Sequence, residues 1–357
     1  MTVPPIDALE PRRLLAFSPI QIGERQYESG FETAVDAQGN TIVAGLFQHT
    51  VDFNPNGAAV KRTAQGETDV FIAKYDTAGV LLWVGQIGGE ESDFNEQLPI
   101  DPTRAGRFVS RPGIQPDFLG EQINSIALDA SGNLYVAGCF TNTADFDPTA
   151  AGVFNLTADE KYDLNDAYLL KMDANGGFLW AKSFGGQFND VINGVAVDPQ
   201  GNPVVTGYFT RRADFDPGPG DFSIDVLGRD DIFVAKYTAA AGKLVWVDTF
   251  GGEETNQELR DAGNGIAIDD VGNIFITGTF SDEADFDPGP SEVFLEADDE
   301  TDMFLKGKAR FSVLILELAC KHPCCTKLKR EGVGWTVPVL TPHLLLFLQK
   351  KNAVSLR

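Results

Sequence analysis

Residues 126–138 read Ile-Ala-Leu-Asp-Ala-Ser-Gly-Asn-Leu-Tyr-Val-Ala-Gly, two short apolar stretches on either side of an Asp-to-Asn turn. The apolar stretches have the length and composition of β-strands. The Asp side chain can accept hydrogen bonds from the turn backbone, and the Gly tolerates a positive φ. The stretch therefore predicts two antiparallel strands joined by a hairpin.

This turn recurs as Asp-x-x-Gly-Asn, at fixed distances from three further motifs. Each Gly lies 13 positions before the first Asp of an Asp-Phe-Asp/Asn-Pro motif. An Asp-x-aromatic strand follows. In three copies a Trp strand comes next, with its Trp 5 positions before a Gly-Gly pair. The turns are Asp36–Asn40, Asp129–Asn133, Asp198–Asn202 and Asp269–Asn273. Such spacing indicates a repeat architecture.

Each repeat predicts four short antiparallel strands, and no stretch within the repeats has the pattern of an amphipathic helix. A sheet of this size has two faces to bury, and stacking the sheets around an axis buries them against each other. The sequence therefore predicts an all-β protein, a β-propeller of four-stranded blades. The blades are expected at about 31–89, 122–186, 191–252 and 263–306, the last of them incomplete.

The same residues resemble a known family. Residues 126–138, followed by Asp-Ala-Tyr-Leu-Leu-Lys at 166–171 and Leu-Trp-Ala-Lys-Ser-Phe-Gly-Gly at 179–186, look like the bacterial SBBP β-propeller repeat. The resemblance covers about residues 31–306. It implies extracellular binding or scaffolding rather than a known reaction, on a ring that is usually seven-bladed. A small closed ring of about four blades and a fragment of a larger ring both remain open.

The N-terminal region gives two expectations. Residues 21–36 align without gaps with residues 183–198, so residues 17–23 are similar to the end of a Trp-type outer strand. We hypothesise that this strand completes the last blade of the ring, which would remove an exposed sheet edge. Residues 1–16 are interpreted as an export-like or disordered segment. Leu9-Glu10-Pro11-Arg12-Arg13-Leu14-Leu15 resembles the LEPR-x-LL-type motif of exported planctomycete proteins.

An insertion separates the first two repeats at about residues 92–118, with four prolines and three arginines. Long loops on rigid scaffolds often carry binding sites. An excursion without a role is the alternative.

The Asp-Phe-Asp motif is the candidate metal site. Two carboxylates at positions i and i+2 of an extended chain point the same way, and Ca²⁺ takes oxygen ligands from such acidic loops. The candidate ligands are Asp145, Asp147, Asp214, Asp216, Asp285 and Asp287. The alternative is that the Asp side chains cap turns while the Phe packs between blades.

Catalysis has little support in the sequence. His49 is the one His within the repeats, and no Gly-x-Ser-x-Gly, His-Glu-x-x-His or phosphate loop occurs. The segment around Trp246 also resembles the tryptophan-docking repeat of pyrroloquinoline-quinone dehydrogenase propellers. Inter-blade packing is the simpler interpretation of Trp83, Trp180 and Trp246, and no set of quinone-site residues is found. Carboxylates recurring once per repeat suggest architecture rather than the acid/base pair of a glycosidase.

The last 52 residues do not follow the template. Residues 306–357 hold 10 basic and 2 acidic side chains, and residues 307–357 lack the expected Trp strand. Cys320, His322, Cys324 and Cys325 are too tightly spaced for the usual paired zinc ligands. A basic membrane-surface segment is an alternative. A frame change or gene truncation that leaves a non-native tail is the preferred hypothesis.

The charge divides in the same way. The chain has 52 acidic and 28 basic residues, a net charge of −24, while residues 1–305 alone carry 50 acidic and 18 basic groups. This acidity argues against a nucleic-acid partner, and no apolar run is long enough to span a membrane. The sequence thus predicts a non-catalytic, extracellular or cell-surface propeller that binds a protein or glycan, with calcium as the candidate cofactor. A quinone-dependent oxidoreductase or a glycan-active enzyme is the alternative.

Overall fold

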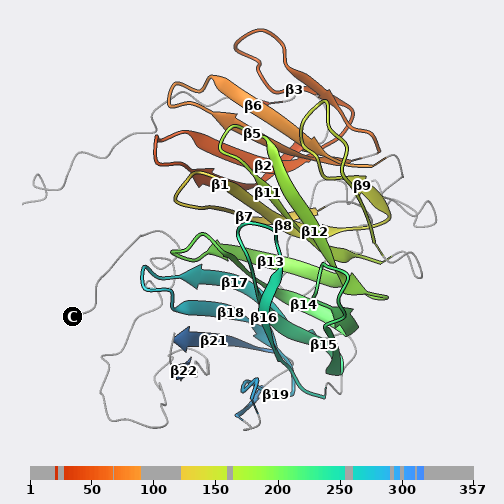
Figure 1. Cartoon of the computed structure of the whole chain (residues 1–357), viewed down its shortest axis with the longest axis vertical. Coiled ribbons are helices and arrows are strands. Elements are labelled where there is room, and N and C mark those ends of the chain that lie inside the picture. Colours follow the sequence, from red (N-terminus) through yellow and green to blue (C-terminus); the bar gives the residue numbers. More distant parts are fainter. Residues whose placement is uncertain are drawn as a thin grey trace, which may run out of the picture.

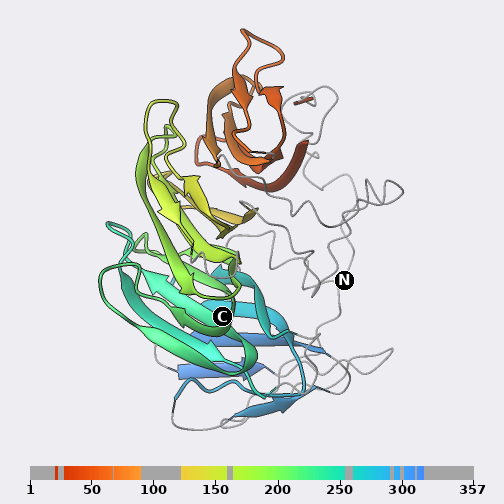
Figure 2. The ribbon, with the colours of Figure 1, turned by 90° about the vertical axis from the view of Figure 1, so that its right-hand side faces the viewer.

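The computed structural model describes residues 21–22, 28–66, 68–89, 122–158, 164–253, 260–289, 293–297, 301–309 and 312–316. Every regular element among these residues is a β-strand, which confirms the predicted all-β fold. The strands form four successive antiparallel units of four, named blades one to four below (Figure 1). Figure 2 shows the blades following one another along an arc, with blade one at one end and blade four at the other.

The strands of each blade run in sequence order from the first strand to the fourth. Blade one consists of β1 (Glu28–Val35), β2 (Thr41–Phe47), β5 (Asp69–Tyr75) and β6 (Leu81–Ile87). Blade two consists of β7 (Gln122–Leu128), β8 (Leu134–Phe140), β11 (Asp166–Met172) and β12 (Phe178–Gly186). Blade three consists of β13 (Asp190–Val197), β14 (Pro203–Asp214), β15 (Ser223–Tyr237) and β16 (Leu244–Phe250). Blade four consists of β17 (Ala262–Ile268), β18 (Ile274–Phe280), β21 (Asp302–Ala309) and β22 (Ser312–Leu316).

The Asp-x-x-Gly-Asn turns join the first two strands of each blade, as the sequence predicts. In blade two, the Asp129 carboxylate accepts hydrogen bonds from the backbone N–H groups of Ser131 and Asn133, each at 2.9 Å, and from the Asn133 amide at 2.7 Å. Gly132 has a φ of 80°, in the left-handed region that Gly enters at least cost. The turn motif therefore specifies the hairpin through its own side chains.

A short side hairpin between the second and third strands carries the Asp-Phe-Asp loop. It is β3 (Thr50–Asp52) with β4 (Lys61–Thr63) in blade one, β9 (Thr143–Asp145) with β10 (Asn155–Thr157) in blade two, and β19 (Glu283–Asp285) with β20 (Phe294–Glu296) in blade four. In blade three the long strands β14 and β15 continue into it. The residue that starts this hairpin has a positive φ in every blade: His49, Asn142, Arg211 and Asp282.

The core lies between the blades. Each of three buried apolar clusters joins one blade to the next. Asparagine side chains add polar links beside them, since Asn124 donates to the Ile192 carbonyl at 2.9 Å and Asn193 to the Gly263 carbonyl at 3.0 Å. Each blade is therefore stabilised mainly by its neighbours, as expected for a repeat protein.

Blade four extends past the boundary expected at residue 306. Strand β21 continues to Ala309, and β22 pairs with Leu305–Ala309. The tail therefore supplies a fourth strand without the Trp, because an apolar segment can satisfy the edge of β21 through backbone hydrogen bonds alone. The segments 1–16, 92–118 and 317–357 lie outside the described residues, as do residues 17–20 and Gly23 of the predicted N-terminal strand. The frame-change hypothesis stays a prediction.

Candidate functional site: the blade junctions

The first Asp of each Asp-Phe-Asp motif closes its own loop. Asp145 Oδ1 accepts hydrogen bonds from the backbone N–H groups of Asp147 at 2.9 Å and Phe154 at 2.7 Å. Asp214 and Asp285 make the same pair of bonds, at 2.8–3.0 Å. Asp52 does so in blade one, and these bonds lower the pKa of its carboxyl.

The second Asp of the motif makes a smaller turn. Asp147 Oδ1 accepts from the Thr149 N–H at 2.9 Å and from its hydroxyl at 2.7 Å. Asp216 and Asp287 each accept one N–H at 2.9 Å, from Gly218 and Gly289. Both acids of the motif are thus engaged with the backbone, as the turn-capping alternative predicts.

The motif brings its two carboxylates into one loop but does not bring the acids of different blades together into a metal-binding group. No cluster of three or more His, Cys, Asp or Glu side chains suited to a metal occurs among the described residues. Calcium at Asp145, Asp147, Asp214, Asp216, Asp285 and Asp287 therefore stays a prediction, with the two carboxylates of each loop as its protein ligands.

The Phe of the motif sits at the centre of a buried aromatic triad. In blade two, Phe146 packs between Phe140 and Tyr168, with ring centroids 5.0 and 4.8 Å away. Equivalent triads occur in the other blades, centred on Phe53, Phe215 and Phe286. All four central rings are at most 1% exposed. The ring also meets the preceding blade, since Phe215 lies 5.7 Å from Phe184 and Phe286 lies 6.2 Å from Phe250. The Phe therefore packs between blades, as the alternative predicts, and within its own blade as well.

The loops also attach each blade to the one before it. Asp145, Asp214 and Asp285 form β-bridges with Gly88, Gly185 and Gly251, the first glycine of each Gly-Gly pair. The second glycine lies so close to the next blade that an added Cβ would overlap a backbone carbonyl, as at Gly186 against Arg212. The Gly-Gly pair therefore permits the blades to meet backbone to backbone.

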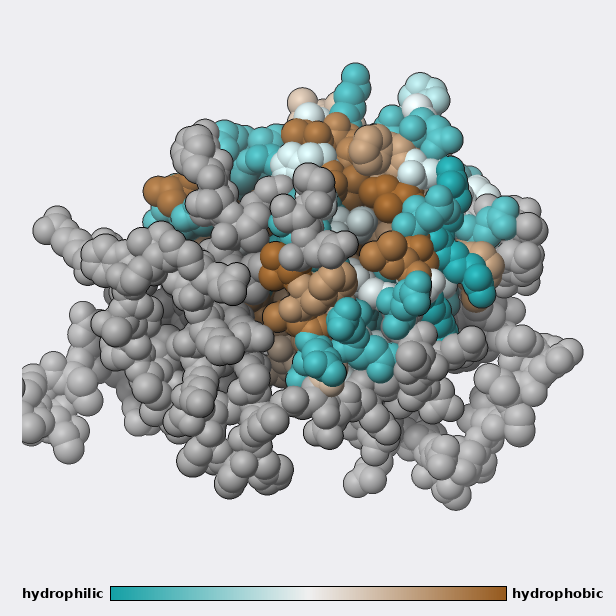
Figure 3. All heavy atoms as spheres, turned by 90° about the horizontal axis from the view of Figure 1, so that it is seen from below, coloured by the Kyte–Doolittle hydropathy of each residue, from teal (hydrophilic) through white to brown (hydrophobic). Residues whose placement is uncertain are grey.

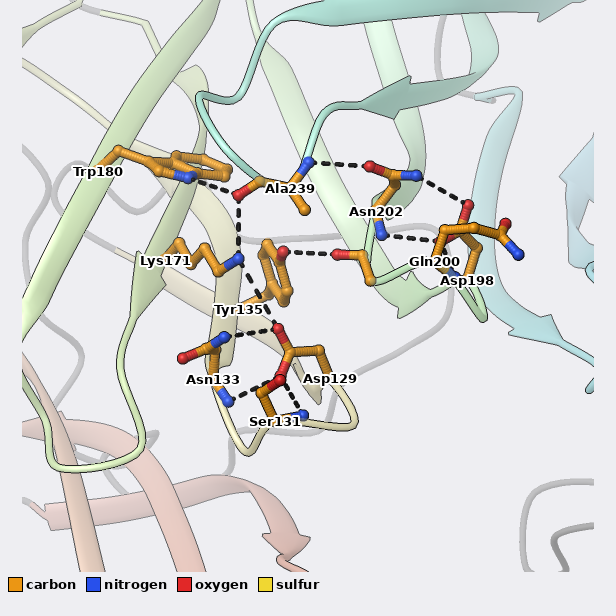
Figure 4. Close-up of polar contacts among 11 residues, drawn as sticks. Asp129, Ser131, Asn133, Tyr135, Lys171, Trp180, Asp198, Gln200, Asn202 and Ala239 are labelled. Atoms are coloured by element: carbon orange, nitrogen blue, oxygen red, sulfur yellow. Dashed lines mark hydrogen bonds and ion pairs between the residues drawn. The ribbon is translucent and has the colours of Figure 1, made fainter.

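A second polar contact locks neighbouring blades through a lysine (Figure 4). Lys171 of blade two donates to the Ala239 carbonyl of blade three at 2.9 Å, and its ammonium lies 3.7 Å from Asp129. The Trp180 indole donates to the same carbonyl at 3.2 Å. Lys74 and Trp83 of blade one make the same contacts to Ala174, at 3.0 and 3.4 Å. We call this arrangement the lysine lock.

Burial and the partners within the lysine lock shift the pKa values of several of its groups. Burial opposes the charge of Asp36, but hydrogen bonds from Lys74 and Asn40 outweigh it and lower the pKa of this carboxyl to about 2. The pKa of Asp198, 2.5 Å from Lys236, is lowered in the same way against its burial. Burial lowers the pKa of Lys171, which Asp129 opposes. Each lysine of the lock therefore lies beside a carboxylate in a buried place where a single unpaired charge would be costly.

The tryptophans lie between blades. An added Cβ at Gly176 or Gly242, in the turn of the following blade, would press against the ring of Trp83 or Trp180. The interpretation of these two residues as inter-blade packing is confirmed. His49 lies at the left-handed position that Asn142, Arg211 and Asp282 occupy in the other blades. Its place is thus set by the backbone of the repeat.

Sequence reasoning missed the lysine lock and a set of buried acids beside the Gly-Gly pairs. The Lys signal was present, because Lys74, Lys171 and Lys236 each follow the Asp of Asp-x-aromatic by five positions. Asp166 of blade two and Asp190 of blade three both approach Gly185 of blade two, where blades two and three meet. Burial, and then the Asp166 charge, raise the pKa of Asp190.

Blade four departs from this pattern. The fifth position after Asp302 is Gly307, and Lys306 stands one residue earlier. It pairs with Ile276, in the register that Ala73 and Ala235 occupy in other blades. Its ammonium lies 3.5 Å from the centre of the Phe250 ring and donates to the Phe286 carbonyl.

Repeated blades with these junctions define a β-propeller repeat protein, and comparisons with known proteins agree. The model of the SBBP family, described as a beta-propeller repeat, matches residues 259–281. An uncharacterized WD repeat-containing protein, L264, of Acanthamoeba polyphaga mimivirus is 24% identical over 285 residues. The match covers 73% of this chain and 18% of the viral protein, so this chain spans less than a fifth of that relative.

Among the described residues, no helix has the length and apolar character that crossing a membrane requires.

Proposed function

We propose that this chain is a non-catalytic binding or scaffold module that acts outside the cell or at its surface. The observation that carries this proposal is the use of the recurring side chains. The acids, lysines and tryptophans that repeat from blade to blade hold turns and junctions together. A scaffold of this kind leaves its surface available for partners.

A groove between blades three and four is the best candidate for the ligand-binding site. It has a volume of about 460 Å³ and lies where the Asp-Phe-Asp loops of both blades approach β16. Asp221, Phe222, Asp248 and Pro288 are among its lining residues, and the Phe222 side chain is 51% exposed. Two carboxylates beside an exposed aromatic ring suit a protein segment that carries Lys or Arg, since the ring can also stack on the cation.

The net charge of −24 supports the same class of partner, because an acidic surface attracts basic segments over a distance. Location outside the cell is supported by the resemblance of residues 9–15 to an export motif. The similarity to a WD repeat-containing protein is consistent with a scaffold.

Binding of basic peptides, measured by fluorescence anisotropy over a peptide array, tests the proposal. We expect Phe222→Ala and Asp248→Asn each to weaken binding by about tenfold. Leu179→Ala, an exposed residue of blade two, is the matched control. If all variants bind equally well, the peptide does not bind in this groove. If the chain binds glycans and no peptide, the ligand is a glycan and the peptide proposal is wrong. Quinone-dependent dye reduction by the purified chain would support the enzyme alternative.

A further inference from the structure

Blades one and four, at the two ends of the described structure, each expose a sheet face that a neighbouring blade buries at the other junctions. The residue after the Asp of Asp-x-aromatic is Val70, Ala167 or Ile232 in blades one to three. Each is fully buried in a cluster shared with the following blade. The equivalent residue of blade four is Met303, which is 62% exposed. Phe275 and Leu305, on the same face, are only half-buried.

The opposite end shows the complementary exposure. The residue before each Asp-x-x-Gly-Asn turn faces the preceding blade, and Leu128, Val197 and Ile268 pack into the inter-blade clusters there. In blade one this residue is Val35, which is 65% exposed. Blade one therefore presents the face that blades two to four use to receive a neighbour.

Blade one also carries part of what blade four lacks. Ile87, Phe184 and Phe250 lie at or near the ends of the outer strands of blades one to three and pack into the cluster shared with the next blade. Ile22 packs against the cluster of Phe47, Phe53 and Phe71 in blade one, as the outer strand of a preceding blade would. In blade four, the described part of β22 ends at Leu316, which pairs with Leu305, so the described pairing does not extend to Met303.

One copy does not bring these two faces together. Blades one and four lie at opposite ends of the molecule, with blades two and three between them (Figures 1 and 2). Figure 3 views the end where blade four lies and shows hydrophobic side chains gathered among hydrophilic ones.

We propose that blade four of one copy docks on blade one of a second copy, head to tail. The new interface continues the three junctions already present in the chain, with Met303 and Phe275 meeting Val35. A head-to-tail contact either closes into a ring or continues as a filament. Two copies form the smallest closed ring, in which every blade has two neighbours.

Light scattering during size-exclusion chromatography of the full chain tests the proposal. We expect a species of twice the chain mass of 38.6 kDa or larger. Met303→Asp and Val35→Asp each place a charge in the apolar contact, so each variant should associate about a hundredfold more weakly. Leu179→Asp, at a residue 47% exposed on the outer strand of blade two, should assemble as the unchanged chain does.

Mixing the two variants identifies the geometry. Met303→Asp leaves blade one intact, and Val35→Asp leaves blade four intact, so their mixture should form a dimer with one good contact. Circular dichroism should show both variants folded, because both side chains are exposed. A monomeric wild-type chain would overturn the proposal. This holds both if the two end faces of one copy pack on each other and if they require a further blade. A mixture that stays monomeric would overturn the head-to-tail arrangement.

Discussion

Blades two and four have the same strand order and aromatic triad, but their lysines occupy different positions and contact different groups. Lys171 of blade two lies beside Asp129 and reaches the next blade. Lys306 of blade four lies one residue earlier, on an apolar register position, and reaches the Phe286 carbonyl of its own blade. In blades one and three, the equivalent carbonyls accept from the hydroxyls of Tyr75 and Tyr237. Intra-blade packing thus survives a shift of one residue, and the shifted lysine contributes to that packing.

The largest expected loss of stability comes from the aromatic triad, which blades two and four share. Phe146→Ala and Phe286→Ala should each lower the free energy of unfolding by about 3–5 kcal/mol, because each empties the centre of a buried triad. Urea denaturation measures both. Phe294→Ala, at a residue 50% exposed in the side hairpin of blade four, is the control. A much smaller cost in blade four than in blade two would mean that its triad is not equivalently packed.

Substitutions of the lysines should differ in their cost to stability between blades two and four. Lys171→Met should cost about 3 kcal/mol, because it leaves the Asp129 carboxylate buried without its cation. Lys306→Ala should cost less, since Ala73 and Ala235 occupy the same register position in other blades. Adding Asp129→Asn to Lys171→Met should recover part of the loss in a double-mutant cycle. Additive effects would show that the lock does not couple the two residues.

The blade contact itself can be broken through a glycine. Gly186→Ala should destabilise the protein by about 2–3 kcal/mol, because its methyl group would push blade three away from blade two. Gly201→Ala is the control: its φ of 84° strains any side chain, but no atom lies within 4 Å of the added Cβ. It should cost about 1 kcal/mol. Thermal unfolding compares the two, and equal costs would argue against a close contact at Gly186.

The lock also predicts a pH dependence. The pKa of Asp36 is lowered from 3.8 to about 2. Its contribution to stability is therefore complete above pH 3.8 and is lost as the pH falls toward 2. Asp36→Asn should flatten this part of the stability curve, and Asp76→Asn, in the next hairpin, is the matched control. An unaltered curve for Asp36→Asn would place the acid sensitivity elsewhere.

Calcium should give the smallest effect. If the Asp-Phe-Asp loops bind it, added calcium raises the melting temperature and a chelator reverses the rise. Combining Asp147→Asn, Asp216→Asn and Asp287→Asn should abolish the response, because these changes make all loops resemble that of blade one with Asn54. A melting temperature insensitive to calcium would leave turn closure as the role of these acids.

The sequence predicted the fold well because the determinants of each blade are local. The turn at Asp129–Asn133 is closed by its own side chains, and the Gly-Gly pairs mark strand ends. The junctions were less accessible, because they join residues far apart in the chain. Lys171 and Ala239 are 68 positions apart, and neither residue type signals a contact by itself. The fourth strand of blade four escaped prediction for a related reason: backbone pairing accepts Ser312–Leu316 without the Trp of the template.

The left-handed position at the start of each side hairpin has a consequence for evolution. His49, Asn142, Arg211 and Asp282 share one backbone conformation but no side-chain chemistry. The fold thus fixes where this residue stands and leaves its identity open, once in each blade. Such a position can acquire a new chemical group without a new loop, so a repeat protein of this kind can vary this side chain one blade at a time.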